Sequence, residues 1–587
     1  MNLKKILTED LKVALEKCDY DKNLAQVSTS NKPELADYQS NIAFALAKSA
    51  NKAPFAVAEE LARALPQTDK YVANVVAPAF INFKFSDKCL CEYANFCLTD
   101  KMVGLEKNKK SRKIFMDYGG ANVAKELHIG HLRSPIIGES LARLHKLLGD
   151  NVISDVYLGD WGTQMGLTIA ELEDEGLLEY YFGRSNKKQE LTLEHLNIAY
   201  PKASLRKKTD EQFRNKAQDY TLFVQSKKQP YYHIYEDIRA LSVERIKQNY
   251  DTLGCHFDLW NGESTAQPYV EPTIKQFKDK NLAKISDGAL IVDVSEPNEN
   301  VPSGKFDENG KELLINPMPP VMLQKANGAD IYDTTELATI NMRYQLYHPD
   351  EYIYVVDKRQ SGHFVIAFRA AKKGELVAKD TILTHVGYGT MNGADGKPFK
   401  TRSGDTIKLE DIINLIKASA EKKLAENGIK GNDKLALQIG LAAMKFGDLI
   451  NNASRDYVFD IDKFASFEGK TGPYVQYTGT RIKSLLAKAH FDGNKILMLD
   501  ADQRELVINL AKLNESYELA YNEYSLSSLC VALYNMCATF SRFYNNTKIL
   551  TEQDQNKRQS SLAICELALG AIVQAANVLG FDIPEKM

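Results

Sequence analysis

The chain of 587 residues contains 44% hydrophobic and 26% charged residues, a composition typical of a soluble globular protein. Its 74 basic and 77 acidic residues give a net charge of −3, which excludes nonspecific coating of nucleic acid but still allows local basic patches. The length is too great for one hydrophobic core, so we expect about three or four domains.

The sequence shows no run of eighteen apolar residues, and Met1–Lys17 alternates apolar with charged residues as an amphipathic helix does. We therefore expect a soluble, cytoplasmic protein with no membrane partner. The 8 cysteines include no Cys-x-x-Cys pair and no matching Cys or His pair at zinc spacing. We predict unpaired thiols, no structural zinc and no metal site.

Residues 1–106 are predicted to form an N-terminal α+β domain. Helical periodicity covers three segments, Leu3–Leu15, Tyr38–Ala50 and Pro54–Leu65. The stretch Tyr71–Phe85 is rich in Val, Phe and Ile and is expected to form strands. The basic stretch Lys107–Lys113 fits a solvated linker and a patch for an RNA partner equally well.

Residues 107–408 alternate short apolar runs with helical stretches. The expected strands are Lys113–Met116, Val152–Tyr157, Tyr352–Val356 and Thr381–Gly387, and Ile129–Leu148 is an expected helix. This alternation predicts a Rossmann-type parallel sheet wrapped by helices, with ligands at the carboxyl ends of the strands. The polar stretch from about 167 to 317, with a helical pattern over Tyr231–Leu253, is too long for a loop. We interpret it as an insertion into the sheet domain.

Residues 409–587 show helical periodicity to the end of the sequence. The clearest helical segments are Leu409–Glu426, Lys434–Asn451, Gly472–Ala489 and Ser560–Leu579. A helical bundle of this size is expected to be a separate domain. The predicted fold class is therefore α/β, with a Rossmann-type parallel-sheet domain that carries an insertion, an N-terminal α+β domain and a C-terminal all-α helical bundle.

The strongest chemical signal is the segment Asp117–Ser134, which follows the first expected strand of the sheet. A glycine-containing turn leads into a helix N-terminus, whose unpaired N–H groups and positive dipole potential favour an anion. Gly130 lets a nucleotide approach the backbone closely, and His128 and His131 share a helical face from which both reach phosphate oxygens. An isolated His-x-x-His also fits a chance match or a metal pair, but the 11-residue context Ala121–His131 argues against chance.

This segment resembles the His-Ile-Gly-His signature of class I aminoacyl-tRNA synthetases. Its flanks, Asn122–Lys125 and Leu132–Ser134, resemble the arginyl-tRNA synthetases in particular. Four later blocks resemble that family in the same order: Gly159–Gln164, Asp357–Phe364, His385–Gly389 and Phe467–Tyr474. The resemblance covers essentially the whole chain, from Asp37 to Met587.

The resemblance implies ATP-dependent ligation of L-arginine to tRNA(Arg). The arginine carboxylate attacks the α-phosphate of ATP to form an arginyl-adenylate, and the terminal ribose of the tRNA then accepts the arginyl group. The implied partners are tRNA(Arg), L-arginine and ATP, with Mg²⁺ as an ion bound to the nucleotide and with arginine activation dependent on tRNA. We expect a monomer. Such chemistry needs positioning and charge neutralisation more than covalent catalysis.

The same resemblance assigns residues to ATP and to catalysis. The ATP-binding residues are His128, Gly130, His131, His385, Val386 and Gly387. The catalytic residues are Lys125, His128, His131, Lys400 and Arg402. The loop Gly396–Gly404 departs from the family's Lys-Met-Ser-Lys-Ser pattern, because Thr401 replaces the second lysine. Lys125 is therefore the expected cation that neutralises charge at the α-phosphate.

Arginine recognition needs carboxylates and planar acceptors, because a guanidinium presents five donors in a fixed fork. The residues that match arginine-binding positions of the family are Asp117, Asn122, His128, Tyr332, Glu336 and Gln360. Tyr332 and Glu336 lie one helical turn apart, and Glu336 replaces the usual Asp. Two glycines replace the usual serine ahead of Asn122. For Asp117, a carboxylate that only caps the turn is an equally good interpretation.

Tyr474, Tyr477 and Arg481 follow i, i+3, i+7 spacing and share one helix face, and aromatic rings with an arginine can stack nucleic-acid bases. A core stripe at helical spacing is the alternative. The resemblance implies that the helical domain binds the anticodon and that the N-terminal domain binds the D-loop. The tRNA-binding residues so assigned are Asn82, Tyr474, Tyr477, Arg481, Tyr544 and Met587.

Two other functions fit parts of the sequence. A different nucleotidylyl transferase with a His-x-Gly-His loop would need neither the helical domain nor the aromatic stripe. A tRNA-binding relative without catalysis would have no need of Lys125, His128, His131 and Gln360, which are all intact.

Overall fold

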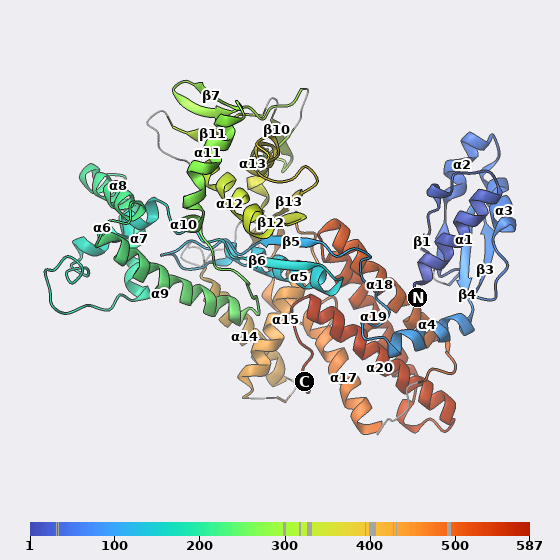
Figure 1. Cartoon of the computed structure of the whole chain (residues 1–587). Helices are drawn as coiled ribbons and strands as arrows, with labels where there is room; N and C mark the ends of the chain where they lie inside the picture. Colours follow the sequence, from blue (N-terminus) through green and yellow to red (C-terminus); the bar gives the residue numbers. More distant parts are fainter. Residues whose placement is uncertain are drawn as a thin grey trace. The chain divides into compact units, whose positions relative to one another are not determined.

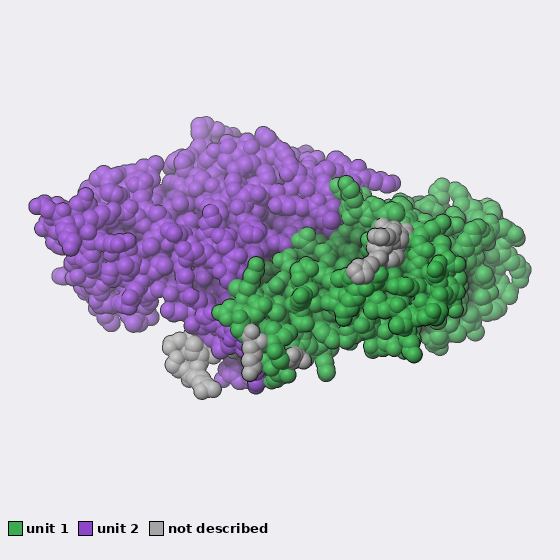
Figure 2. Space-filling view, turned by 90° about the horizontal axis from the view of Figure 1, so that it is seen from below, with its two compact units in different colours: residues 1–107, 423–446, 465–587 green, residues 108–422, 447–464 purple. Residues whose placement is uncertain are grey.

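The computed structural model describes the chain apart from residues 31, 33, 298–300, 316–317, 326–331, 394, 398–406, 427, 430 and 490–494, and apart from the side chains of 301, 315 and 332. The described residues form two compact units, coloured separately in Figure 2. Unit 1 contains residues 1–107, 423–446 and 465–587. Unit 2 contains residues 108–422 and 447–464.

Unit 2 is built on a four-stranded parallel sheet with the strand order β13-β12-β5-β6 (Figure 1). Its strands are β5 (Lys113–Asp117), β6 (Asn151–Asp155), β12 (Glu351–Asp357) and β13 (Ile382–Tyr388). Helix α5 (Arg133–Leu147) leads from β5 to β6, and α13 (Ser361–Lys373) leads from β12 to β13. The chain thus leaves β5 toward one edge and β12 toward the other. This strand order confirms the predicted Rossmann-type parallel sheet. Open α/β sheets bind ligands at the point where the strand order reverses, here between β5 and β12.

The central strands of this sheet are buried, which explains their uninterrupted apolar runs. Residues 352–355 of β12 and residues 114–116 of β5 are all buried. A parallel strand covered on both faces shows no alternation of polar and apolar residues. Polar residues stand at the carboxyl ends instead, where Asp117, Asp155 and Asp357 close β5, β6 and β12.

The segment between β6 and β12 adds helices and two small antiparallel sheets to unit 2. The helices are α6 (Thr163–Asp174), α7 (Leu193–Arg206), α8 (Glu211–Gln225), α9 (Tyr231–Thr252), α10 (Glu263–Ala266), α11 (Val270–Asp279) and α12 (Tyr332–Tyr347). The strands are β7 (Ala283–Ser286), β8 (Ala289–Val292), β9 (Val301–Phe306), β10 (Glu312–Ile315) and β11 (Val321–Gln324). Leu337 and Ile340 of α12 share one buried cluster with Phe115 of β5, and this packing fixes α12 against the parallel sheet.

Unit 1 combines an antiparallel sheet with a helical bundle. The sheet has the order β1-β2-β4-β3 and consists of β1 (Ser28–Thr29), β2 (Tyr38–Ser40), β4 (Phe80–Phe85) and β3 (Tyr71–Val76). The helices that lie wholly in unit 1 include α1 (Leu3–Lys17), α2 (Ile42–Ala50), α3 (Pro54–Ala64), α4 (Asp87–Thr99), α17 (Gly472–Ala489), α18 (Ala501–Glu523), α19 (Ser527–Asn546) and α20 (Gln555–Val578). Helices α14 (Leu409–Glu426) and α15 (Asp433–Leu449) contribute residues to both units.

Two sequence predictions about local structure are wrong. Residues 38–40 form β2 and not the start of a helix, because they pair with residues 81–83 of β4, and α2 begins only at Ile42. Residues 129–131 form a short 3₁₀ turn, η2, and α5 begins at Arg133. In both places hydrogen bonds to a distant segment override the local helical periodicity.

An ion pair with a buried aspartate joins the N-terminal segment of unit 1 to its helical bundle. Arg504 of α18 donates two hydrogen bonds of 2.8 Å to Asp37, whose side chain is 4% exposed. Asp37 also accepts a hydrogen bond from the Phe85 N–H at 2.8 Å. The N-terminal segment and the C-terminal helices therefore form one compact unit, while the boundaries of the three predicted domains stay predictions.

Helix α20 is a core helix of unit 1. By length and composition it could cross a membrane, but 67% of its most apolar stretch is buried inside the fold. An apolar helix that packs on several sides is expected at the centre of a helical bundle.

Candidate active site

The candidate site lies at the carboxyl edge of the parallel sheet in unit 2. The turn after β5 contains Gly119 and Gly120, with φ of +96° and +33°. A Cβ on Gly119 would lie 3.0 Å from the Phe257 ring, so the turn requires glycine there. The Ser134 hydroxyl accepts a hydrogen bond from the Gly119 N–H at 2.8 Å and donates one to the Val355 carbonyl of β12 at 2.7 Å. The Ser134 side chain thus connects the turn after β5 to strand β12, on the two sides of the switch point.

The two histidines of the signature lie in one 3₁₀ turn ahead of α5. The His128 N–H donates to His131 Nδ1, and the Gly130 N–H donates to His128 Nδ1, both at 3.1 Å. The ring centres are 4.0 Å apart. The histidines therefore do face the same side, although the 3₁₀ turn and not the first turn of α5 brings them together.

In the free protein both imidazoles are neutral hydrogen-bond donors. Burial, with the nearby His128 and Lys125, lowers the pKa of His131 to about 3. Burial and Lys125 also lower the pKa of His128. Because each Nδ1 accepts a hydrogen bond, the proton of each neutral ring resides on Nε2. The pair can donate two N–H groups to an anion, but the positive charge must come from another residue.

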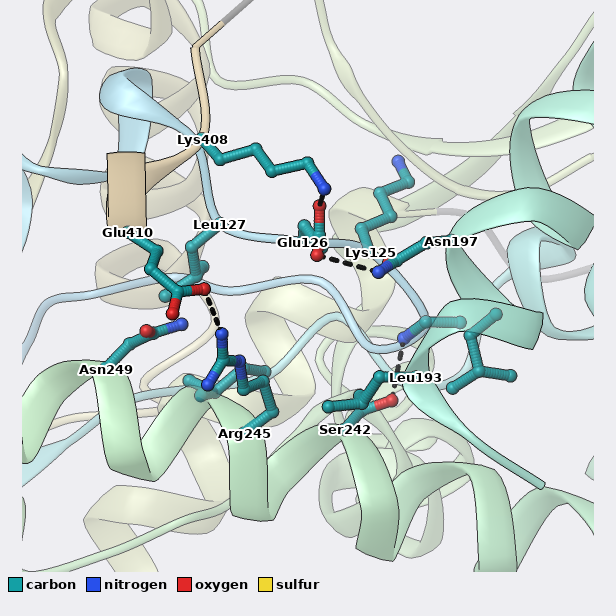
Figure 3. Close-up of a pocket in the computed structure, with 13 residues that line it drawn as sticks. Lys125, Glu126, Leu127, Leu193, Asn197, Ser242, Arg245, Asn249, Lys408 and Glu410 are labelled. Carbon is teal, nitrogen blue, oxygen red and sulfur yellow. Dashed lines mark hydrogen bonds and ion pairs between the residues drawn. The ribbon is translucent and has the colours of Figure 1, made fainter. Parts of the chain in front are cut away.

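Lys125 lies in the segment before the histidine turn and lines a pocket with residues of α7 and α9 (Figure 3). Ala124, with φ of +63°, turns the chain just before it, and the Ala124 N–H donates to Ser242 Oγ at 3.1 Å. The Lys125 Nζ is 4.6 Å from the ring centre of Tyr200, and no carboxylate of the described residues forms an ion pair with it. An aromatic face positions the ammonium. Because no carboxylate of the described residues neutralises it, its positive charge stays available to a phosphate.

The residues just beyond the predicted Lys/Arg loop pair with the histidine segment. Residues 407–409 and 127–129 exchange two main-chain hydrogen bonds of 2.9 and 3.0 Å. In Figure 3 the side chains of Lys408 and Glu126 meet, with 2.6 Å between Nζ and Oε2. The Glu126 Oε1 accepts a hydrogen bond from Asn197 of α7 at 2.7 Å. These contacts bring residues 407–409 against the segment that leads into the histidine turn.

Asp117, at the end of β5, is bound to an arginine of the protein itself. Its Oδ2 lies 2.7 Å from Arg343 Nη2, and Asp155 Oδ2 at the end of β6 lies 3.0 Å from the same nitrogen. Burial raises the pKa of Asp117 to about 7, against the opposing effect of Arg343. The fold already engages this carboxylate, which neither interpretation of the sequence foresaw.

Glu336 of α12 is a buried carboxylate. Its side chain is 6% exposed, and its Oε1 has no hydrogen-bond partner among the described residues. Burial raises the pKa of Glu336. Burial, with the nearby charges of Asp160 and Glu336, also raises the pKa of Glu263 to about 7. Two neighbouring carboxylates suit a guanidinium. Sequence reasoning missed Glu263, because no motif surrounds this lone carboxylate of the insertion.

The predicted nucleotide residues of β13 lie on the other side of the switch point. His385 Nε2 is 3.1 Å from the Val356 carbonyl, and its ring stacks on a phenylalanine of α13. Burial lowers the pKa of His385 to about 4. Val386 is buried, and a Cβ on Gly387 would lie 3.1 Å from the Lys358 Cα. This part of the edge therefore favours glycine and close approach of a flat ligand.

Asn122 and Gln360 lie at the same edge of the sheet. Asn122 is half-buried beside Gly159, where a Cβ would clash with the asparagine side chain. Gln360 is exposed at the end of η4 (Lys358–Gln360), the 3₁₀ turn that follows β12. Three other predicted positions lie outside the described residues: Lys400, Arg402 and the side chain of Tyr332.

In unit 1 the predicted tRNA residues of α17 and α19 form an aromatic cluster around Arg481. The guanidinium carbon lies 4.8 Å from the ring centre of Tyr477 and 4.9 Å from that of Tyr544. Arg481 also donates to the Tyr477 hydroxyl at 2.7 Å, and the Tyr474 hydroxyl is bonded to Ser541 at 3.2 Å. Tyr477 is 39% exposed, so this end of the stripe is a surface feature and not core.

The two remaining tRNA predictions lie elsewhere in unit 1. Asn82 is half-buried in β4, opposite Gln39 and Asn74 of the neighbouring strands. Met587 is half-buried at the end of the sequence. Both positions stay predictions.

Three protein-family models match successive parts of the chain. The arginyl tRNA synthetase N terminal domain matches residues 3–85, the catalytic domain of class I (R) tRNA synthetases matches residues 94–461, and the DALR anticodon binding domain matches residues 475–587. The three matches follow one another along the chain, in the same order as the sequence blocks that resemble this family.

Curated relatives and solved structures agree with these matches. The chain is 40% identical to the arginine--tRNA ligase of Agathobacter rectalis, over 99% of both chains, and 40% identical to that of Alkaliphilus oremlandii, over 97% of both. The arginyl-tRNA synthetases of Plasmodium falciparum and Thermus thermophilus share its fold, each with a TM-score of 0.81, at 22% and 21% identity. The alignments cover 100% of this chain and 99% and 100% of those chains. The chain belongs to the arginyl-tRNA synthetase family of class I.

Proposed function

We propose that the protein is an arginine--tRNA ligase, which joins L-arginine to tRNA(Arg) with ATP through an arginyl-adenylate. The observation that carries the proposal is one sheet edge that holds two neutral imidazoles ready to donate to phosphate and a buried carboxylate, Glu336, with an unpartnered oxygen. A nucleotide and a guanidinium fit these two features. Full-length similarity to arginine--tRNA ligases supports the same activity.

The reaction has two steps. An oxygen of the arginine carboxylate attacks the α-phosphorus of ATP, and the bond to pyrophosphate breaks. A hydroxyl of the terminal tRNA ribose then attacks the arginyl carbonyl, and AMP leaves. The Nε2–H groups of His128 and His131 hold phosphate oxygens, while Lys125 neutralises the charge that builds on the α-phosphate. ATP enters as its Mg²⁺ complex, and Lys400 and Arg402 supply further cations.

Arginine binds beside the acidic end of α12. Glu336 and Glu263 accept hydrogen bonds from its guanidinium, and Tyr332 adds a planar partner one turn before Glu336. Asn122 and Gln360 bind the amino-acid end of the substrate near the nucleotide. The adenosine of ATP lies against Gly130 and the β13 residues 385–387, where a side chain on Gly387 would have no room.

The tRNA extends over unit 1. We divide the chain into a D-loop domain over 1–106, a catalytic domain over 107–408 with an insertion at about 167–317, and an anticodon domain over 409–587. The family matches at 3–85, 94–461 and 475–587 support three successive domains, and the catalytic match extends past residue 408. The cluster of Arg481, Tyr477 and Tyr544 stacks on anticodon bases. The protein works as a monomer in the cytoplasm.

The protein should charge tRNA(Arg) with arginine and reject lysine and citrulline by about 10⁴ in kcat/KM, because a polar pocket discriminates strongly against a substrate that leaves its groups unpaired. Glu336→Gln should raise the KM for arginine by about 10- to 100-fold, because it removes a charge-assisted hydrogen bond. Aminoacylation rates with each amino acid measure both effects. Glu271→Gln makes the same chemical change at an exposed position of α11 and should leave the kcat and the KM for arginine unchanged. Turnover of lysine comparable to that of arginine would contradict the proposal.

Lys125→Ala should lower the kcat of aminoacylation by about 10²–10³ and change the KM for arginine little, because the ammonium acts mainly on charge that develops in the transition state. Lys125→Arg should recover only part of the rate, since a planar fork does not replace a point charge. Steady-state kinetics at saturating tRNA decide the matter. Lys208→Ala, at an exposed position beyond α7, is the matched control. A near-normal kcat in Lys125→Ala would show that the lysine is only solvated.

Tyr477→Ala and Arg481→Ala should each raise the KM for tRNA by about 5- to 100-fold, because the loss of one base stack costs about 1–3 kcal/mol. Since Tyr477 is 39% exposed, the melting temperature should stay close to that of the wild type. Aminoacylation at varied tRNA concentration and thermal melts test the two halves of the prediction. Leu519→Ala, which truncates a residue of α18 that is 44% exposed, serves as control. Unfolding of both variants without a selective rise in the KM for tRNA would identify the residues as core.

A further inference from the structure

Arg343 of α12 is a buried cation at the carboxyl edge of the parallel sheet. Its side chain is 0% exposed, and its Nη2 lies 2.7 Å from Asp117 Oδ2 and 3.0 Å from Asp155 Oδ2. One nitrogen therefore ties the ends of β5 and β6. The guanidinium carbon also lies 4.6 Å from the ring centre of Phe115 and 4.8 Å from that of Tyr157. A guanidinium suits such a site because it is planar, weakly hydrated and able to lie against aromatic faces.

Arg343 and Tyr354 both lie near the carboxylate of Glu336. Arg343 and Glu336 are seven positions apart on α12 and therefore share one face of the helix. The Tyr354 hydroxyl accepts a hydrogen bond from Arg343 Nη1 at 3.4 Å. Tyr354 also lies near Glu336 and, together with Arg343, opposes the rise that burial causes in the pKa of that carboxyl. One oxygen of Glu336, Oε1, has no partner among the described residues. Arg343 and Tyr354 thus surround Glu336 from the protein side, and the buried Oε1 still lacks a partner.

The four carboxylates of this region need more than one positive charge. Asp117 and Asp155 share Arg343, and Glu336 lies near His363, whose pKa is raised, against the effect of burial, by a hydrogen bond with Asp333 and by the charge of Glu336. Glu263 forms no ion pair among the described residues, and burial, together with the charge of Glu336, helps to raise its pKa. Without Arg343, Asp117 and Asp155 would form a second place where a guanidinium could bind. An arginine substrate would then have two competing sites, only one of which holds its carboxylate toward the nucleotide.

We propose that Arg343 is a positioning and specificity residue, an internal guanidinium that occupies Asp117 and Asp155 and leaves Glu336 to the guanidinium of the substrate. This inference rests on the proposed ligation of arginine. Arg343 itself does not contact the substrate in this proposal, because Arg343 acts through Tyr354 and through the two aspartates.

Chemical rescue of Arg343→Ala tests the inference. The variant should raise the KM for arginine in aminoacylation by about 10- to 100-fold, because Glu336 loses its fixed geometry and the aspartates compete for the substrate. Guanidinium ion at millimolar concentration should fill the vacated site and lower that KM by about tenfold. Urea, which has the same size and shape but no charge, should leave the KM unchanged. Neither compound at that concentration should improve the wild-type KM.

Two further variants separate positioning from stability. Arg343→Lys should raise the KM for arginine by about 3- to 10-fold, since one ammonium cannot replace the fork that meets both aspartates and Tyr354. Arg504→Met removes a half-buried arginine that pairs with the buried Asp37 in unit 1, and it should lower the melting temperature without changing the KM for arginine.

The inference fails if folded Arg343→Ala keeps a KM for arginine within about twofold of the wild type, or if urea rescues it as well as guanidinium does. If the alanine variant does not fold, Arg343→Lys provides the test instead. A wild-type KM for arginine in Arg343→Lys would also refute the inference. Failure of the wild type to charge tRNA with arginine would instead refute the proposed function, so the two outcomes are distinct.

Discussion

The balance of buried charge at the carboxyl edge of the parallel sheet constrains the rest of the site. Strands β5 and β6 both end in buried carboxylates, and an unpaired buried carboxylate is costly in free energy. Arg343 reaches Asp117 and Asp155 at 2.7 and 3.0 Å and satisfies both. Because Arg343 belongs to α12, the same contact holds that helix over the sheet. The position of Glu336 on the helix follows from it.

The two small substrates meet different electrostatics at this edge. The nucleotide side offers neutral imidazole donors and one ammonium, because burial lowers the pKa values of His128 and His131. The arginine side carries an excess of carboxylate over cation. Burial raises the pKa values of Asp117 and Glu263 to about 7, so the free protein holds part of this excess as protonated carboxyl groups. An arriving guanidinium supplies the missing positive charge.

Local signals in the sequence predicted the sheet and the histidine pair, whereas contacts between distant segments could not be predicted. The expected strand Lys113–Met116 differs from β5 by one residue, since a buried parallel strand is a continuous apolar run. The 3₁₀ turn at Ile129 was missed because its N–H bonds to the carbonyl of Ile407. Arg343 was missed because no sequence pattern distinguishes it from other arginines in helices. Only the fold shows which carboxylates it contacts. The i, i+3, i+7 face of α17 was predictable, but the exposure of Tyr477 required the structure.

Calorimetric titration of the protein with arginine, at pH 7 in buffers with different enthalpies of ionisation, measures how many protons binding releases. The folded-state pKa values of Asp117 and Glu263 are raised to about 7, so both carboxyls are partly protonated at that pH. A bound guanidinium favours their charged forms and lowers those pKa values. The account predicts net release of about 0.5–1 proton per arginine at pH 7 and none above about pH 9, where both groups are already ionised. Binding without proton exchange at pH 7, or with proton uptake, would contradict it.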